Sequence, residues 1–180
     1  KKRYNQSDVN GLGKAPKFVL CNFVQGREYG EAKFPSYAAS IKEDMPGDVE
    51  PTFVLAMPDT FVQRCRDADV IYFHGGDDHL VQYWMKQFDI PALFTDKVVA
   101  TNSASSNMLV KHYWTCDWRE CGDGLGLLPI KFIPQYESSF GADDPRGPID
   151  WQQAKNELET YGAELPIYAL KEGEYEVFEV

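Results

Sequence analysis

The stretch VVATNSASSNML (98–109) joins an apolar run to a cluster of small polar residues and then to a segment with helical spacing. This order is typical of a strand-to-helix corner in an α/β protein. A serine at such a corner serves either as the cap of the helix or as a nucleophile raised above the edge of the sheet. Both roles are open for Ser103.

Strands and helices alternate along the chain on both sides of this corner. Apolar runs predict strands at 17–24, 51–57, 69–76, 96–102, 129–136, 166–170 and 174–180. Helical spacing and capping residues predict helices at 34–45, 58–68, 77–88, 103–114 and 151–162. Gly-rich or polar composition predicts irregular structure at 115–128 and 137–150. The alternation predicts right-handed βαβ units, and so a three-layer αβα sandwich built on a mostly parallel sheet.

Length and composition predict the domain organisation. A chain of 180 residues is long enough for one domain with a sizeable core. We expect residues 17–180 to form that single α/β domain. Residues 1–16 are mainly polar and include Gly11 and Gly13, so we expect a polar arm or the remnant of a missing N-terminal element.

The charge disfavours two classes of partner. The formal net charge is −10, and no cluster of Lys and Arg is present, which disfavours nucleic acid and anionic membranes as partners. No apolar run approaches the ~18 residues that a membrane-spanning helix needs. We expect a protein that binds neither nucleic acid nor a membrane, and reduced cysteines in it would indicate a cytoplasmic location.

The cysteines and glycines indicate neither a metal nor an organic cofactor. Cys21, Cys65, Cys116 and Cys121 do not have the spacing of a zinc site, so we expect reduced structural thiols and no metal. A dinucleotide fingerprint and a P-loop are both missing from the sequence, so no organic cofactor is predicted.

Four segments with chemically useful residues follow predicted strands. They are HGGDDH (74–79), TNSASS (101–106), PQYES (134–138) and KEG (171–173). Ligands of open α/β sheets bind beyond the carboxyl ends of the strands, so these segments are the candidate site. HGGDDH is either a glycine cradle for a ligand or a tight turn into a helix capped by Asp77 or Asp78.

Taken in order, these motifs resemble one known family. FHGGDD (73–78), VVATNSAS (98–105), GLGLLPIKFIPQY (124–136) and YALKEG (168–173) are similar to the successive motifs of the dipeptidase E and cyanophycinase family of serine peptidases. The similarity covers roughly residues 17–180. It implies a fold like that of the class I glutamine amidotransferases, which is flavodoxin-like, and a Ser-His-Glu triad that hydrolyses peptide bonds next to aspartyl residues.

The resemblance assigns roles to individual positions. It implies that Ser103 is the nucleophile and that Glu172 is the acidic member of the triad. Gly75 and Gly76, together with Ala104, would frame the oxyanion hole. The position of the triad histidine is occupied by Gln135.

This departure predicts weak or absent hydrolysis. A glutamine amide can form hydrogen bonds, but it cannot accept the proton of a serine hydroxyl as a general base. His79 is a candidate substitute base, whereas His112 should lie two turns along the helix and point elsewhere. Thr101 and Ser105 stand where the family has glycines, which argues for a relaxed corner because a β-branched residue fits a strained turn poorly.

Three functional hypotheses remain open at this point. The first is a divergent serine-peptidase protein with little or no activity, and the second is an active serine dipeptidase with an unusual base. The third is a non-catalytic interaction protein on the same fold.

The expected ligand is a short acidic peptide or a small molecule, for which Arg27, Arg119 and Arg146 are candidate carboxylate-binding residues. Trp114, Trp118 and Trp151 could form the interface of a homodimer or cover the Gly-rich segment.

Overall fold

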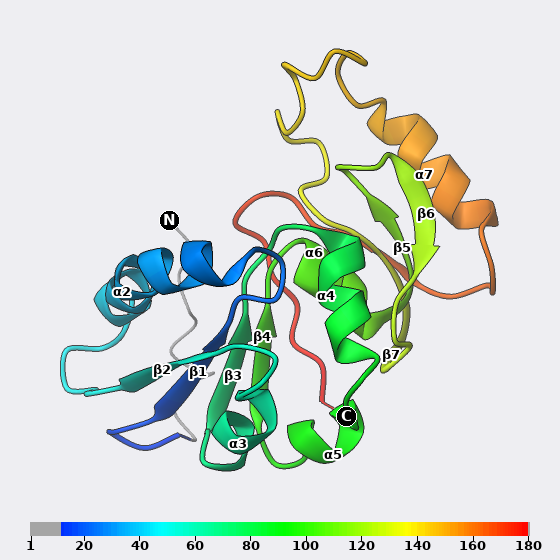
Figure 1. Cartoon of the computed structure of the whole chain (residues 1–180). Helices are drawn as coiled ribbons and strands as arrows, with labels where there is room; N and C mark the ends of the chain where they lie inside the picture. Colours follow the sequence, from blue (N-terminus) through cyan, green and yellow to red (C-terminus); the bar gives the residue numbers. More distant parts are fainter. Residues whose placement is uncertain (1–11, 180) are drawn as a thin grey trace. The chain divides into compact units, whose positions relative to one another are not determined.

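The computed structural model describes residues 12–179 and divides the chain into two compact units. The first unit ends at Asn102 and the second begins at Ser103. Figure 1 labels the elements of both units. Most of the predicted arm, residues 1–11, lies outside the described residues.

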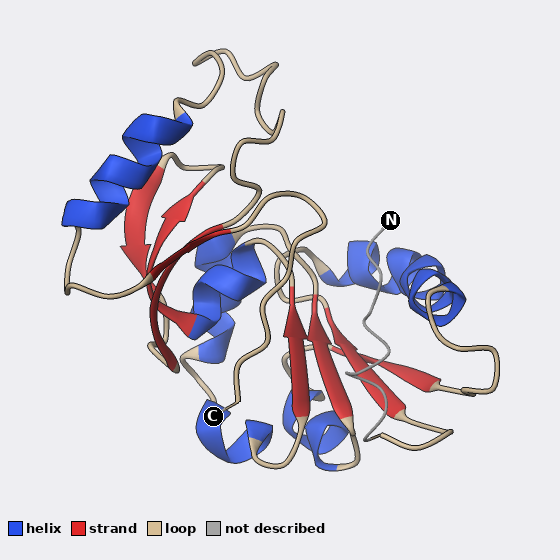
Figure 2. Cartoon of the chain, turned by 180° about the vertical axis from the view of Figure 1, so that it is seen from behind, coloured by secondary structure: helices blue, strands red, loops and turns tan. Residues whose placement is uncertain are grey.

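The first unit is built on a parallel four-stranded sheet with the order β2-β1-β3-β4. Figure 2 shows its four arrows pointing the same way. The strands are β1 (Lys17–Cys21), β2 (Thr52–Ala56), β3 (Val70–Phe73) and β4 (Val98–Thr101). The helices are α2 (Arg27–Glu43), α3 (Phe61–Arg66), α4 (Asp78–Met85) and α5 (Ile90–Phe94). The connections are crossovers, as the predicted βαβ units require.

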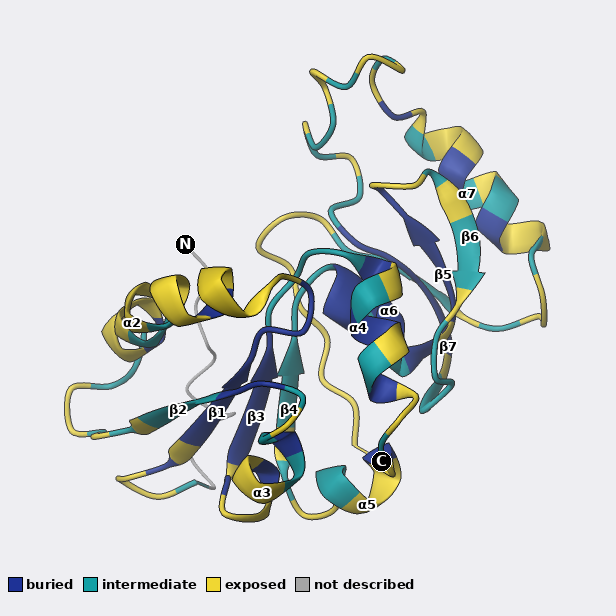
Figure 3. Cartoon of the chain, viewed as in Figure 1, coloured by how far each residue is buried: buried dark blue, intermediate teal, exposed yellow. Residues whose placement is uncertain are grey.

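Helices cover both faces of this sheet. On one face, Phe18, Leu20 and Tyr72 pack against Ile41 and its neighbours on α2. On the other face, ring contacts join Phe73 to Phe61 of α3 and to Phe94 of α5, with centroids 5.9 Å apart in both pairs. Successive strand residues point to opposite faces, so the continuous apolar runs of β1 and β3 supply both layers of core. Figure 3 shows β3 buried along its length.

The second unit contains a mixed four-stranded sheet with the order β6-β5-β7-β8. Its elements are α6 (Ala104–Leu109), β5 (Val110–Thr115), β6 (Glu120–Asp123), β7 (Leu128–Ile133), α7 (Trp151–Thr160) and β8 (Ile167–Ala169). β5 and β6 form an antiparallel hairpin, whereas β5, β7 and β8 run parallel. The carboxyl ends of these three parallel strands therefore meet at one edge.

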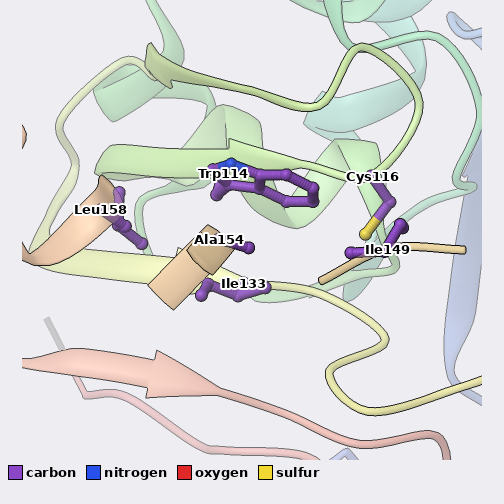
Figure 4. Packing of buried hydrophobic residues seen from close by; sticks show 6 residues of the cluster. All are labelled: Trp114, Cys116, Ile133, Ile149, Ala154 and Leu158. Atoms are coloured by element: carbon purple, nitrogen blue, oxygen red, sulfur yellow. The ribbon is translucent and has the colours of Figure 1, made fainter. Parts of the chain in front are cut away.

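The core of the second unit lies between its sheet and α7. Trp114 of β5 and Ile133 of β7 pack against Ala154 and Leu158 of α7, as Figure 4 shows. The indole Nε1 of Trp114 donates to Oε2 of Glu157 at 2.8 Å, so this buried donor is satisfied. Trp114 and the partly buried Trp151 are thus core residues, and only Trp118 of the three predicted interface tryptophans is exposed.

Lys131 of β7 is a buried cation in the same unit. Its side chain is only 1% exposed, and Nζ donates to the carbonyl oxygens of Leu158 and Glu159 at 2.8 and 2.9 Å. These two carbonyls belong to the last turn of α7, where carbonyl groups lack their usual i+4 amide partners. The charge therefore stabilises the negative end of α7.

The structure confirms the α/β fold class and corrects several elements. The predicted helix at 103–114 is wrong in its second half, because α6 ends at Leu109 and residues 110–115 form β5 between β6 and β7. The Gly-rich stretch contains β6, and the described residues 174–179 contain no strand. The strands form one parallel and one mixed sheet rather than a single sheet.

The helices of the described residues include no candidate for a membrane span. The longest, α2, has 17 residues and carries charged side chains along its length.

Candidate active site

Ser103 has the backbone conformation of a strained corner. Its φ is 53° and its ψ is −123°, a combination that residues other than glycine rarely adopt. Its carbonyl oxygen accepts from the amides of Ser106 and Asn107 at 2.8 and 3.2 Å, so Ser103 begins α6. Its hydroxyl makes no capping hydrogen bond to α6. The helix-cap role left open by the sequence is therefore excluded for the Ser103 side chain.

The neighbours of Ser103 explain how the corner tolerates a threonine and a second serine. Thr101 is the last residue of β4, in register with Phe73 of β3, so its β-branched side chain has ordinary strand geometry. Ser105 is 0% exposed and lies in the first turn of α6. The sharp turn falls at Ser103 itself. The expectation that Thr101 and Ser105 imply a relaxed corner is therefore wrong.

Ala104 follows directly and is buried. Its amide lies in the first turn of α6, where amides have no carbonyl partner within the helix. Such an amide next to a nucleophile is suited to stabilise an oxyanion. Its assignment to an oxyanion hole stays a prediction.

Gln135 lies two residues beyond the end of β7. It has a φ of 55°, and Glu137 has the same value. The amide oxygen Oε1 of Gln135 is buried and has no hydrogen-bond partner among the described residues. The position predicted to replace a catalytic histidine thus holds a buried acceptor without a donor.

Hydrogen bonds fix the loop that carries Gln135. The thiol of Cys116 donates to the carbonyl oxygen of Pro134 at 3.3 Å, and the amide of Tyr136 donates to Leu170 at 2.8 Å. Nζ of Lys171 pairs with Oε2 of Glu137 at 2.5 Å, and this hydrogen bond raises the pKa of Lys171. The loops after β7 and β8 therefore stay side by side beyond the ends of their strands.

Glu172 lies in the turn after β8. The turn is closed by the amide of Glu174, which donates to Lys171 at 3.1 Å, and Gly173 provides a φ of 86°. The Glu172 side chain is exposed. In the part of the chain that the structure describes, no hydrogen bond joins Ser103, Gln135 and Glu172, so their predicted roles in one triad stay predictions.

The glycine turn after β3 belongs to the first unit and has a structural role. Asp77 accepts from the amide of Leu80 at 2.7 Å and caps α4, so the predicted cap is confirmed. A Cβ at Gly76 would lie 2.7 Å from Cβ of Val24, which explains a glycine there by close packing. The assignment of Gly75 and Gly76 to an oxyanion hole is not tested by this geometry.

The three histidines lie in different environments. His79 is exposed on α4, and its role as a substitute base stays a prediction. His112 is buried on β5, where Nδ1 is 2.6 Å from Oδ1 of Asp123 and Nε2 accepts from the amide of Ala163 at 3.0 Å. His112 therefore lies on a strand and not on the predicted helix, and its two hydrogen bonds give it a structural role. His74 stacks on Tyr37, with ring centroids 3.8 Å apart.

The three candidate carboxylate-binding arginines are engaged within the protein. Arg27 donates to Asp59 at 2.9 Å. Arg146 donates to both carboxylate oxygens of Asp144 and holds the pKa of that carboxyl well below its usual range. Arg119 donates to the carbonyl oxygen of Gly147. A ligand carboxylate would have to compete with these partners.

The cysteines are structural thiols, as the sequence predicts. All four are free, and three of them are buried. Burial raises the pKa of Cys65 to about 12 and that of Cys121 to about 11, so both stay protonated at neutral pH. The described residues include no group of His, Cys, Asp and Glu that could hold a metal ion.

A surface depression of about 220 Å³ lies in the first unit, lined by the starts of β1 and β2 and by α3. Lys17 and Thr52 begin these strands, so the depression lies at the amino ends, opposite the edge where α/β sheets bind ligands. Its lining brings together no group suited to catalysis, and we assign no function to it.

Comparisons with known proteins connect this geometry to solved structures. A scan against protein-family models finds no match, and a search of curated proteins finds no match either. A crystal structure of a peptidase from an acI-B1 actinobacterium matches with a TM-score of 0.60 and 23% identity, covering 92% of this chain and 71% of that one. A structure described as a "Putative Peptidase E Protein" from Listeria monocytogenes EGD-e matches with a TM-score of 0.53 and 13% identity, covering 87% and 78% of the two chains. The chain therefore has the α/β fold of these peptidase E-like structures.

Proposed function

We propose that the protein is a divergent serine hydrolase of the peptidase E-like fold, in which Ser103 is a positioned nucleophile and turnover is weak or absent. The observation that carries this proposal is the backbone of Ser103, with φ 53° and ψ −123°. Strain of this kind costs of order 1–3 kcal/mol and is concentrated at functional sites. A serine that only started a helix would not need it.

The chemistry explains why turnover is low. Attack of the Ser103 Oγ on a peptide carbonyl requires a base that takes the hydroxyl proton and later returns it to the leaving amine. Gln135 occupies the position predicted for that base, and an amide does not accept a proton at neutral pH. Loss of a triad member costs about 10⁴-fold or more in kcat. Short peptides with an aspartyl residue are the proposed ligands.

Labelling with a fluorophosphonate tests the nucleophile. We expect covalent modification of Ser103, with loss of fluoride, that is much slower in the wild-type protein than in Gln135→His, because attack on phosphorus also needs a base that takes the hydroxyl proton. Mass spectrometry should place the label on Ser103, and Ser103→Ala should abolish it. The matched variant Ser106→Ala, on the same helix, should keep the label. Absence of labelling in both the wild-type protein and Gln135→His would refute the proposal.

Restoration of the base tests the cause of low turnover. Gln135→His should raise hydrolysis of Asp-containing dipeptides above that of the wild-type protein, measured by amine release. Gln152→His on α7 is the control, because it adds an imidazole at an exposed position. A folded Gln135→His protein without any gain would mean that the missing histidine does not limit the reaction. Wild-type turnover that disappears in His79→Ala would instead identify His79 as the base.

A further inference from the structure

The amide oxygen Oε1 of Gln135 is a buried polar atom to which the proposed chemistry gives no role. It has no hydrogen-bond partner among the described residues. Burial of an acceptor without a donor costs desolvation free energy, so such groups are rare unless something outside the chain satisfies them. A glutamine that merely replaced a lost histidine could extend to solvent.

The backbone around Gln135 is held in one conformation. Its φ of 55° is unfavourable for a residue other than glycine. The residues on both sides are held, Pro134 by the Cys116 thiol at 3.3 Å and Tyr136 by Leu170 at 2.8 Å. Its own carbonyl oxygen accepts from the amide of Ser138 at 3.1 Å. The fold therefore fixes the backbone from which the Gln135 side chain projects.

The position of the loop suits ligand binding. Gln135 follows β7, and Leu170 follows β8, at the carboxyl edge where the parallel strands of the second unit end. Ligands of α/β sheets bind at such an edge. The Glu137–Lys171 ion pair closes the same two loops against each other.

We propose that Gln135 is a ligand-recognition residue, whose Oε1 accepts a hydrogen bond from an N–H group of the bound peptide. The donor is an ammonium or an amide N–H, since a carboxylate or carbonyl oxygen would repel Oε1. This inference rests on the proposed function only in taking a short acidic peptide as the ligand. On this inference, glutamine in place of histidine at position 135 gives the site a ligand-binding group, rather than only removing the base.

Calorimetric titration with three matched ligands tests the inference. The ligands are Asp-Gly, aspartyl-sarcosine, which lacks the peptide N–H, and succinyl-glycine, which lacks the ammonium group. We expect the wild-type protein to bind Asp-Gly about tenfold more tightly than one of the two analogues, the range of one net hydrogen bond. The analogue that loses affinity identifies the donor.

Variants of Gln135 assign the effect to Oε1. Gln135→Met, which has a similar length and no amide, should bind Asp-Gly and the weakened analogue equally. Gln135→Glu, which keeps an acceptor, should retain the discrimination. Gln152→Met, on the exposed face of α7, should behave as the wild-type protein does. These measurements do not depend on activity, so they stay separate from the labelling of Ser103.

Three outcomes would overturn the inference. The first is no binding of Asp-Gly by the wild-type protein, and the second is no discrimination against either analogue. The third is equal discrimination by the wild-type protein and Gln135→Met, which would mean that solvent satisfies Oε1. If Ser103 is labelled and any of these occurs, the proposed function stands without this role. If Ser103 is not labelled and discrimination is found, the site binds peptides without hydrolysing them.

Discussion

At the scale of single residues, Ser103 has a backbone conformation that favours glycine, and its side chain makes no bond that caps α6. The conformation therefore stores free energy that local structure does not recover. Of all residues, glycine would adopt this backbone conformation with the least loss of stability. The serine is explained by its hydroxyl.

This strain predicts an unusual order of stability. Ser103→Gly should have a free energy of unfolding about 1 kcal/mol higher than Ser103→Ala, because glycine adopts positive φ without steric cost. Urea denaturation of both variants measures the difference. Ser106, inside α6, is the control, and there the alanine variant should be the more stable by about 1 kcal/mol. Equal stability of Ser103→Gly and Ser103→Ala would contradict the strained corner.

The roles proposed for the candidate site residues stay predictions. Gln135 and Glu172 follow β7 and β8 of one sheet, whereas Ser103 follows β4 of the other sheet, a division that the sequence did not predict. The unpartnered Oε1 of Gln135 depends on which donors other segments bring near it. The engagement of Arg119 and Arg146 likewise depends on a loop distant in the chain, since Arg119 reaches Gly147 and Arg146 reaches Asp117.

At the scale of elements, the end of α7 depends on one glycine and one histidine. Gly162 follows the helix with a φ of 61°, and a Cβ there would lie 2.4 Å from the ring of His112. The next amide, that of Ala163, donates to Nε2 of the same ring. Gly162 is therefore required both for its conformation and for the space that the ring occupies.

Gly162→Ala should destabilise the protein by more than the roughly 1 kcal/mol that positive φ costs alone. Gly173→Ala measures that cost separately, because Gly173 has a φ of 86° and a Cβ there would meet nothing within 4 Å. Thermal unfolding of both variants gives the comparison. If Gly162→Ala is no less stable than Gly173→Ala, the close contact with His112 does not matter.

The error at residues 103–114 shows the limit of periodicity at this scale. Apolar residues in VKHYWT (110–115) fit a helix as well as a strand over so short a run. The partners decide the outcome, because β5 pairs with β6 on one side and β7 on the other. Trp114 and Tyr113 then point to opposite faces and enter different clusters of the core. Pairing of this kind involves residues up to about twenty positions away, which a local pattern does not contain.

At the scale of the whole molecule, buried thiols predict how stability responds to alkaline pH. Burial raises the pKa of Cys65 to about 12 and that of Cys121 to about 11, and it raises the pKa of Cys21 as well. Between pH 9 and 11 the unfolded chain loses thiol protons that the native protein keeps. The unfolded state binds fewer protons there, so the free energy of unfolding falls as pH rises.

Below pH 8 the buried, protonated thiols should contribute fully to the free energy of unfolding. At pH 10 the midpoint of urea denaturation should be lower. Cys65→Ala removes one contributing group, so its midpoint should fall less between these two values than that of the wild-type protein. Ser106→Ala should keep the full decrease. A Cys65→Ala protein with an unchanged decrease would show that other groups cause the alkaline loss.

The sequence by itself determined the properties that follow from the order of residues along the chain. It predicted the α/β class, most strands and helices, a helix cap at Asp77 or Asp78, the thiols and the polar residues that follow the strands, because periodicity and turn chemistry are local. Only the tertiary structure decided that the strands divide between two sheets, that residues 110–115 are a strand, that Ser103 is strained and that Oε1 of Gln135 is buried without a partner. Each of these depends on contacts between distant segments, and the free energy of such contacts outweighs local preference.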